Sequence, residues 1–107
     1  GKLPLWLAPV QVAVATITTD ANDYAEEVVE ALRAQGIRAV SDLRNEKINY
    51  KVREHSHQKI PLVAVVGRRE ADERTIALRT LGGKDQEMMS LDDALEAIAA
   101  QARAPYA

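Results

Sequence analysis

The first part of the chain contains two short apolar runs separated by a long amphipathic stretch, and this order constrains the fold more than any other feature of the sequence. Residues 10–17 begin by alternating valine with glutamine and alanine, and small apolar side chains on the second face are typical of a strand covered on both sides. Apolar residues then recur at helical spacing from Asp20 to Gln35, and Gly36 follows as a helix stop. Residues 37–43 predict a second strand. A strand–helix–strand unit of about 30 residues makes its two strands parallel, with a right-handed crossover.

In the second part of the chain, the pattern changes from parallel strands joined by a helix to strands joined by short turns. A short connection after the third strand makes the next strand pair antiparallel. We therefore expect one α/β domain, in which a mixed and mostly parallel sheet of five strands is flanked by three helices. The further elements that the pattern predicts are a helix at 46–59, which Asn45 caps and Pro61 ends, a central strand at 61–66, a charged turn at 68–74, strands at 75–80 and 86–89 around a turn at 81–85, and a last helix that Ser90 caps.

Composition excludes several classes of protein and site. A chain of 107 residues fits one domain, and the absence of cysteine excludes disulfides and thiolate metal sites. No apolar run approaches the roughly 20 residues that a membrane span needs, and the first residues lack the features of a signal peptide, so a cytoplasmic protein is expected. The chain begins without methionine and is expected to be an excised piece of a longer protein.

Motifs for catalysis are absent from the sequence. It contains no P-loop, dinucleotide fingerprint, nucleophile elbow or zinc motif, and Gly82-Gly83-Lys84 is interpreted as a hairpin turn. His55 and His57 are two residues apart on a predicted helix and cannot chelate one metal ion. A small α/β enzyme that uses either histidine as an acid or base stays open as an alternative.

A locally basic segment stands out in a chain whose net charge is −2. From Arg44 to Lys59 there are five Lys or Arg residues against two Glu. A basic element on an otherwise acidic small domain is a candidate surface for a polyanion. Single-stranded RNA loops need cations for the backbone and a few fixed polar side chains that read splayed bases.

Several motifs resemble the anticodon-binding domain shared by the class II threonyl-, prolyl-, histidyl- and glycyl-tRNA synthetases. The stretches Trp6–Val12 and Arg44–Ile48 are most similar to the threonyl branch, and Asn49 departs from it where glycine is common. The resemblance covers nearly all of the chain. The motifs that carry it are Asp42-x-Arg44-x-Glu46-Lys47-Ile48, Lys51-Val52-Arg53-Glu54, Lys59-Ile60-Pro61 and Val65-Val66-Gly67.

The resemblance implies a fold and a function. It implies the strand order 2-1-3-4-5, with residues 1–8 as a linker from a missing catalytic domain and residues 9–107 as the anticodon-binding domain. The domain would bind threonine tRNA and read the G and U shared by all threonine anticodons, as part of a ligase that charges tRNA with threonine. ATP, magnesium and zinc are expected only in the missing catalytic domain. The parent enzyme is expected to be a homodimer, and the isolated domain a monomer without an active site.

The resemblance also implies roles for individual residues. Glu70 and Arg79 match positions that read anticodon bases. A carboxylate suits guanine, whose Watson–Crick edge presents two adjacent N–H donors. Arg53 and Asn45 match further contacts to the anticodon loop. Contacts with the phosphates of the loop are expected, from charge and position alone, at Lys47, Lys51 and Lys59.

Other interpretations of the same residues remain open. Glu70 could be one more exposed turn charge, and Asn45 could be a helix cap and nothing more. Arg53 could instead form a salt bridge with Asp42 or Glu46. The alternative function for the whole chain is a stand-alone module of the same fold that binds a protein or another RNA.

Overall fold

The computed structural model describes residues 5–80 and 86–102, so the turn predicted at 81–85 lies outside the described residues. Helices and strands alternate along the first half of the chain, as the apolar pattern predicts. The elements are, in order, η1 (Leu5–Leu7), β1 (Val12–Thr16), η2 (Thr19–Ala21), α1 (Asn22–Ala34), β2 (Ala39–Asp42), α2 (Ile48–His57), β3 (Leu62–Val66), α3 (Arg68–Glu73), β4 (Thr75–Thr80), β5 (Gln86–Ser90) and α4 (Leu91–Ala102).

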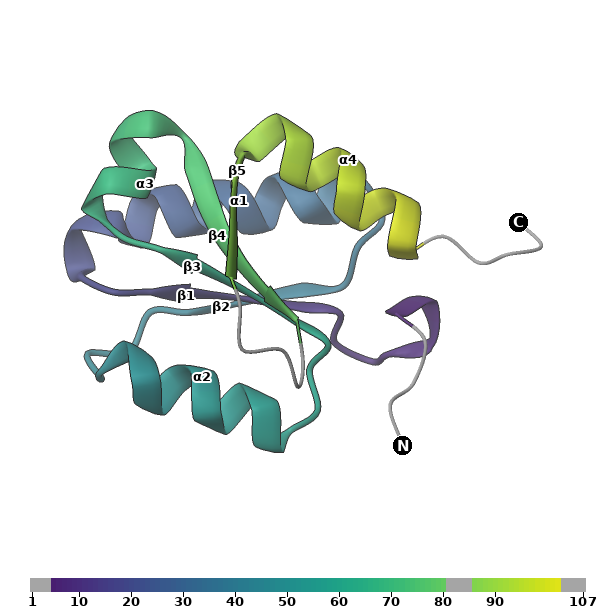
Figure 1. The fold of residues 1–107 in the computed structure, drawn as a ribbon, viewed down its shortest axis with the longest axis horizontal. Coiled ribbons are helices and arrows are strands. Elements are labelled where there is room, and N and C mark those ends of the chain that lie inside the picture. Colours follow the sequence, from purple (N-terminus) through teal and green to yellow (C-terminus); the bar gives the residue numbers. More distant parts are fainter. Residues whose placement is uncertain (1–4, 81–85, 103–107) are drawn as a thin grey trace.

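The five strands form one sheet in the order β2-β1-β3-β4-β5, which confirms the predicted order (Figure 1). β1 pairs in parallel with β2 and with β3. β4 pairs antiparallel with β3 and with β5. The sheet is therefore mixed rather than mostly parallel, because the chain turns back on itself after β3 instead of crossing over the sheet.

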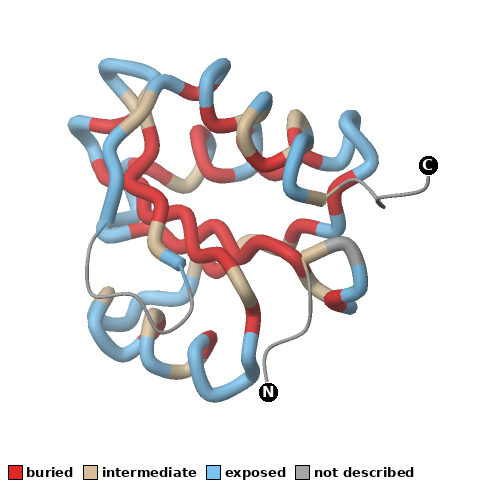
Figure 2. The backbone as a smooth tube through the Cα atoms, turned by 45° about the vertical axis from the view of Figure 1, so that its right-hand side comes forward, coloured by how far each residue is buried: buried red, intermediate tan, exposed pale blue. Residues whose placement is uncertain are grey.

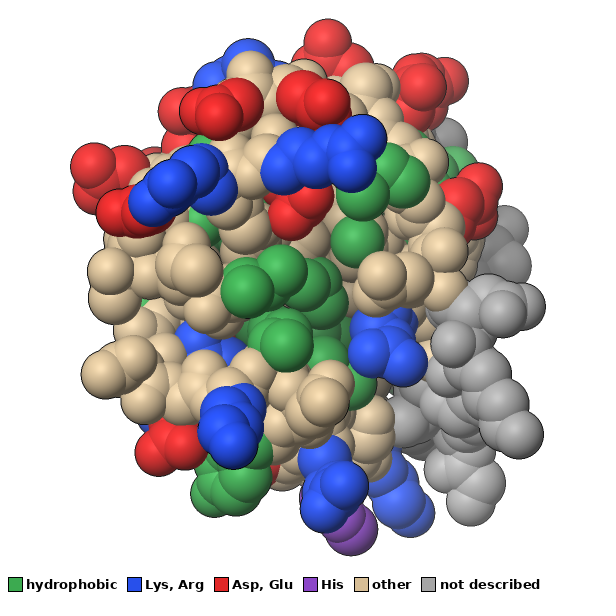
Figure 3. All heavy atoms as spheres, turned by 60° about the vertical axis from the view of Figure 1, so that its left-hand side comes forward, with side chains coloured by type: hydrophobic (Ala, Val, Ile, Leu, Met, Phe, Trp, Pro, Cys, Tyr) green, Lys and Arg blue, Asp and Glu red, His purple; other side chains and the backbone are tan. Residues whose placement is uncertain are grey.

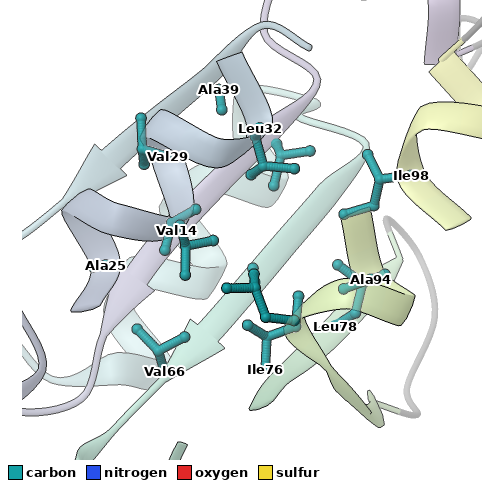
Figure 4. Close-up of a cluster of buried hydrophobic side chains, with 14 of the residues drawn as sticks. Val14, Ala25, Val29, Leu32, Ala39, Val66, Ile76, Leu78, Ala94 and Ile98 are labelled. Carbon is teal, nitrogen blue, oxygen red and sulfur yellow. The ribbon is translucent and has the colours of Figure 1, made fainter. Parts of the chain in front are cut away.

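The sheet separates two hydrophobic clusters of unequal size. The larger cluster lies between the sheet and helices α1 and α4, and it includes Val14, Leu32 and Ile98 (Figure 4). The smaller cluster lies on the opposite face, where Ile48 and Val52 of α2 pack on strand residues. The central strands are buried, whereas the outer faces of the helices are exposed (Figure 2). None of the described helices is long and apolar enough to cross a membrane.

The segment at 68–74, predicted as a charged turn, contains the short helix α3. Its first turn is closed by the side chain of Glu70, because the Gly67 N–H donates to Glu70 Oε1 at 2.7 Å. Arg74 ends the helix in the left-handed conformation, with φ of 56°. The described residues therefore form four α-helices, where the sequence predicted three.

The ends of the other helices test two predicted caps. Asn45 does not cap α2, because the helix begins only at Ile48 and its N-cap, Lys47, makes no side-chain capping bond. The cap predicted for α4 is confirmed, since the Asp93 N–H donates to Ser90 Oγ at 3.1 Å.

Residues 5–8, predicted as part of a linker, are held against the amino-terminal end of β1. The side-chain amide of Gln11 donates to the Leu5 carbonyl at 2.9 Å. The Arg38 guanidinium donates to the Ala8 carbonyl at 2.7 Å, and Ala8 is buried. This short segment therefore packs with the domain.

Candidate nucleic-acid interface

The carboxyl ends of β1 and β3 meet where the sheet changes its direction of winding. The chain leaves β1 toward β2 on one side and places β3 on the other, with α1 and α2 on opposite faces (Figure 1). In open α/β sheets, ligands bind at such a switch point. Ile17 follows β1 and Gly67 follows β3, and the two segments are joined by the bond from the Ile17 N–H to the Val66 carbonyl at 2.9 Å.

The α2 face of the sheet is only partly covered. Met88 of β5 is paired with Ala77 of β4 on this face, yet Met88 is 54% exposed because α2 packs nearer to β1. Ile17 is also exposed at the end of β1. We call Ile17, Ile48, Val52, Ala77 and Met88 the open patch. Figure 3 shows a hydrophobic surface on this side of the molecule with Lys and Arg side chains around it.

Glu70 lies beside Ile17 of the open patch. Only 8% of the residue is exposed, so it is not the exposed turn charge that the alternative interpretation assumed. One carboxylate oxygen accepts the bond from Gly67. A Cβ atom added to Gly67 would lie 3.0 Å from that oxygen and 3.1 Å from Ile17 Cδ1, so the carboxylate is held close to the patch. The carboxylate keeps further lone pairs for a ligand.

Arg79 lies on the same face of the sheet, one β-strand repeat away from Ala77. It is paired with Val63 of β3 and with Gln86 of β5, and it is half-buried. Among residues 5–80 and 86–102, the Arg79 side chain makes no hydrogen bond or ion pair. No described residue therefore holds its guanidinium away from the open patch.

Arg53 is exposed on α2, immediately after Val52 of the open patch. The alternative of a salt bridge between Arg53 and Asp42 or Glu46 is wrong, because no described carboxylate pairs with Arg53 and Arg44 pairs with Asp42 instead. Arg44 Nη2 lies 2.7 Å from Asp42 Oδ2 and 2.8 Å from Glu54 Oε1. Arg53, Glu70 and Arg79 thus each lie next to a member of the open patch, namely Val52, Ile17 and Ala77.

Two of the remaining predicted residues lie at the amino-terminal end of α2, and one lies at the far end. Asn45 and Lys47 are exposed in the loop before α2, on the side of the molecule where β2 ends. Lys59 is exposed beyond the carboxyl end of α2, with φ of 60°. A helix of ten residues is about 15 Å long, so Lys59 is well separated from Asn45 and Lys47.

Lys51 contradicts its predicted role at a phosphate. Its side chain is only 1% exposed. Its ammonium donates to the Thr16 carbonyl at 2.8 Å, to Thr16 Oγ1 at 3.3 Å and to the Asp42 carbonyl at 3.1 Å. Burial lowers the pKa of Lys51. The prediction of a phosphate contact is therefore wrong, and Lys51 instead attaches α2 to the ends of β1 and β2.

Asp42 joins two further side chains to this buried network. His55 Nε2 lies 2.8 Å from Asp42 Oδ2, and both groups are buried. The bonds from Arg44, and then the bond from His55, hold the pKa of Asp42 well below its usual range. The described residues contain no cluster of His, Cys, Asp and Glu that could hold a metal ion. His55 thus fixes α2 to the sheet, and its burial disfavours His55 as the acid or base of the alternative enzyme, whereas His57 is exposed.

Sequence reasoning missed the inward orientation of Lys51 and His55, although the spacing contained a signal. Ile48, Lys51, Val52 and His55 follow the i, i+3, i+4, i+7 pattern of one helix face. The apolar residues alone, Ile48 and Val52, predict a buried helix face narrower than the one that the structure shows. A lysine and a histidine on it required buried acceptors, and the ends of β1 and β2 provide them.

Comparison with known proteins identifies the family. Residues 11–101 match the model of a family described as "Anticodon binding domain". Threonine–tRNA ligases from Rhodospirillum rubrum and from Caulobacter sp. are each 61% identical to the chain over 105 residues. Each alignment covers 98% of this chain but only 16% of the relative, so the chain spans a small part of these proteins.

Solved structures agree with the family match. The crystal structure of the RNA binding domain of threonyl-tRNA synthetase from Cryptosporidium parvum superposes with a TM-score of 0.89 at 30% identity, covering 94% of this chain and 26% of that chain. Prolyl-tRNA synthetase from the same organism shares the fold, with a TM-score of 0.77 at 22% identity, covering 94% of this chain and 24% of that chain. Since the family match extends over most of the described fold, the chain belongs to the anticodon binding domain family.

Proposed function

We propose that this chain binds the anticodon loop of threonine tRNA as part of a threonine–tRNA ligase. The observation that carries the proposal is a carboxylate, Glu70, fixed at the border of an exposed hydrophobic surface that Arg53 and Arg79 also border. The names of the relatives support the parent activity, which is charging tRNA with threonine during protein synthesis. ATP, magnesium and zinc would bind in the catalytic part of a dimeric, cytoplasmic parent enzyme.

Base reading in this proposal uses two kinds of contact, namely apolar contacts to the faces of the bases and hydrogen bonds to their edges. The open patch contacts the faces of splayed bases, which are apolar. Glu70 accepts the two adjacent N–H donors on the Watson–Crick edge of guanine, and Arg79 donates to acceptors on a neighbouring base. All threonine anticodons share G and U at their middle and last positions, so a site for these two bases serves every such tRNA.

The loop before α2 provides further contacts with the RNA in this proposal. Asn45 and Lys47 are exposed there, and Arg53 follows one and a half turns into the helix. Asn45 and Arg53 contact bases or sugars of the loop, and Lys47 contacts phosphates. The buried network of Lys51, His55 and Asp42 holds α2 in place while these exposed residues bind.

A binding titration with matched RNA stem-loops tests the proposal. One stem-loop carries a threonine anticodon, and the second has the shared G and U replaced on the same stem. The chain should prefer the first by about 1–3 kcal/mol per replaced base. Arg79→Ala should lose that order of affinity for the threonine loop and much less for the replaced loop. Equal affinity for both stem-loops would instead support a module that binds another RNA or a protein.

A further inference from the structure

The outer face of α2 carries an exposed aromatic ring that the proposed base-reading site does not use. Tyr50 is 50% exposed and points away from the sheet, because it lies about half a helix turn from Val52. A shallow hollow of about 190 Å³ is lined by Tyr50, Arg53, Glu54 and His57. Its volume is below the roughly 300–1,000 Å³ of sites for drug-sized ligands, so it fits a single planar group.

The tyrosine ring is held in place from two sides. The Arg44 guanidinium lies over the ring, with Cζ 5.8 Å from the ring centroid. A hydrogen bond with the Glu54 carboxylate raises the pKa of the Tyr50 hydroxyl. Arg44 is itself paired with Glu54 and with the buried Asp42. An exposed ring that is fixed in this way loses little conformational freedom when it meets a partner.

Arg53 connects the hollow with the open patch. Successive residues on an α-helix are about 100° apart, so Arg53 lies between the sheet-facing Val52 and the outward-facing Tyr50. Tyr50, Arg53 and His57 form one stripe at i, i+3 and i+7. A strand of RNA that leaves the open patch past Arg53 therefore reaches Tyr50 next.

We infer that Tyr50 stacks on an unpaired base of the same RNA loop, outside the two bases that Glu70 and Arg79 read. This inference builds on the proposed function and adds a third base subsite to it. Stacking on an aromatic ring tolerates every base, because every base has a π-face. It therefore suits a loop position that differs among threonine tRNAs, while Arg53 supplies positive charge that attracts an RNA strand.

Alanine substitution measures the contribution of the ring to RNA binding. Tyr50→Ala should weaken binding of the threonine stem-loop about 5- to 150-fold, the range for one stacked base. Tyr50→Phe keeps the ring and should bind within about twofold of the parent chain. Leu7→Ala is the matched control, because Leu7 is 48% exposed on η1, outside the proposed interface, and this variant should bind as the parent chain does.

Fluorescence of 2-aminopurine, placed at each loop position in turn, separates stacking from a merely structural role of Tyr50. Quenching on binding should disappear at one loop position in Tyr50→Ala and persist at the two read positions. The slope of log K against log salt should stay unchanged, because no phosphate contact is lost. Unchanged affinity and quenching in Tyr50→Ala would overturn the inference, while the proposed function would stand if Arg79→Ala still loses selectivity.

Discussion

The substitution Glu70→Gln separates base reading from helix capping at the same side chain. In the parent chain, one carboxylate oxygen accepts from the Gly67 N–H at 2.7 Å, and the residue is 8% exposed. Glutamine has the same shape, and its amide oxygen can take over that bond. Its NH₂ group then points to the position that the second carboxylate oxygen occupied. A donor would therefore face the N–H donors of guanine.

The expected loss follows from that exchange. A carboxylate that accepts two N–H groups makes two charge-assisted bonds, and the glutamine replaces one acceptor by a donor. We expect the affinity for a loop with guanine at the middle position to fall by about 2–3 kcal/mol, or roughly 30- to 150-fold. The free energy of unfolding should change by less than about 0.5 kcal/mol, because the cap of α3 is retained.

Glu70→Ala is the comparison that isolates the cap. It removes both the helix cap and the base contact, so the free energy of unfolding should fall by about 0.5–2 kcal/mol in addition to the loss of RNA affinity. Titrations of both variants with loops that carry guanine or adenine, together with urea unfolding, measure the two effects separately. A Glu70→Gln chain that keeps the parent preference for guanine would refute the assignment of Glu70 to that base.

Two further substitutions test the surroundings of the site. Gly67→Ala should reduce the preference for guanine, because the new Cβ would lie 3.0 Å from Glu70 Oε1 and displace this carboxylate oxygen. The free energy of unfolding should change less, since a φ of −125° at this position suits any residue. Titration with loops that carry guanine or adenine measures the preference. Asp42→Asn should lower the free energy of unfolding by about 2–3 kcal/mol at neutral pH, since Arg44 and His55 lose a charged partner. Arg44 holds the pKa of Asp42 below the ordinary aspartate value of about 3.9. When the pH falls to that value, Asp42 takes up a proton in the unfolded chain but not yet in the folded chain. The contribution of Asp42 to the free energy of unfolding of the parent chain is therefore lost as the pH falls further. Urea unfolding of the asparagine variant against pH should lack that part of the acid dependence, and identical pH profiles would contradict it.

The regular elements could be predicted from the sequence because their cause is local. The alternation in residues 10–17 and the apolar stripe of residues 20–35 each predict one element, and two parallel strands then follow from the crossover rule. β4 has the predicted bounds, Thr75–Thr80, because its alternation is regular and no proline or glycine interrupts it. The strand order came from resemblance to a family, since strand spacing alone does not determine which strands are neighbours.

The parts that were missed depend on contacts between distant residues. α3 has six residues and no apolar period, and it forms because Glu70 returns to the Gly67 N–H. Lys51 is buried because two strand ends, 9 and 35 residues away along the chain, present carbonyls to its ammonium. Local charge therefore predicted an exposed basic helix, whereas the fold uses part of that charge internally.

The position of the candidate site was predictable only in part. Resemblance to the family points to Glu70 and Arg79, and the structure adds the open patch that both border. Exposure of Met88 could not be anticipated, because it depends on how far α2 extends over the sheet.

The most direct test of the central claim is to map the RNA contact on the folded chain by NMR. The chain is labelled with ¹⁵N and titrated with the threonine stem-loop, and amide shifts are followed residue by residue. Amide shifts are expected around the open patch, at Ile17, Ala77, Arg79 and Met88, and at Arg53 and Glu70. The outer faces of α1 and α4, on the opposite side of the sheet, should be unaffected. Shifts concentrated on α1 and α4, with the open patch unchanged, would contradict the account.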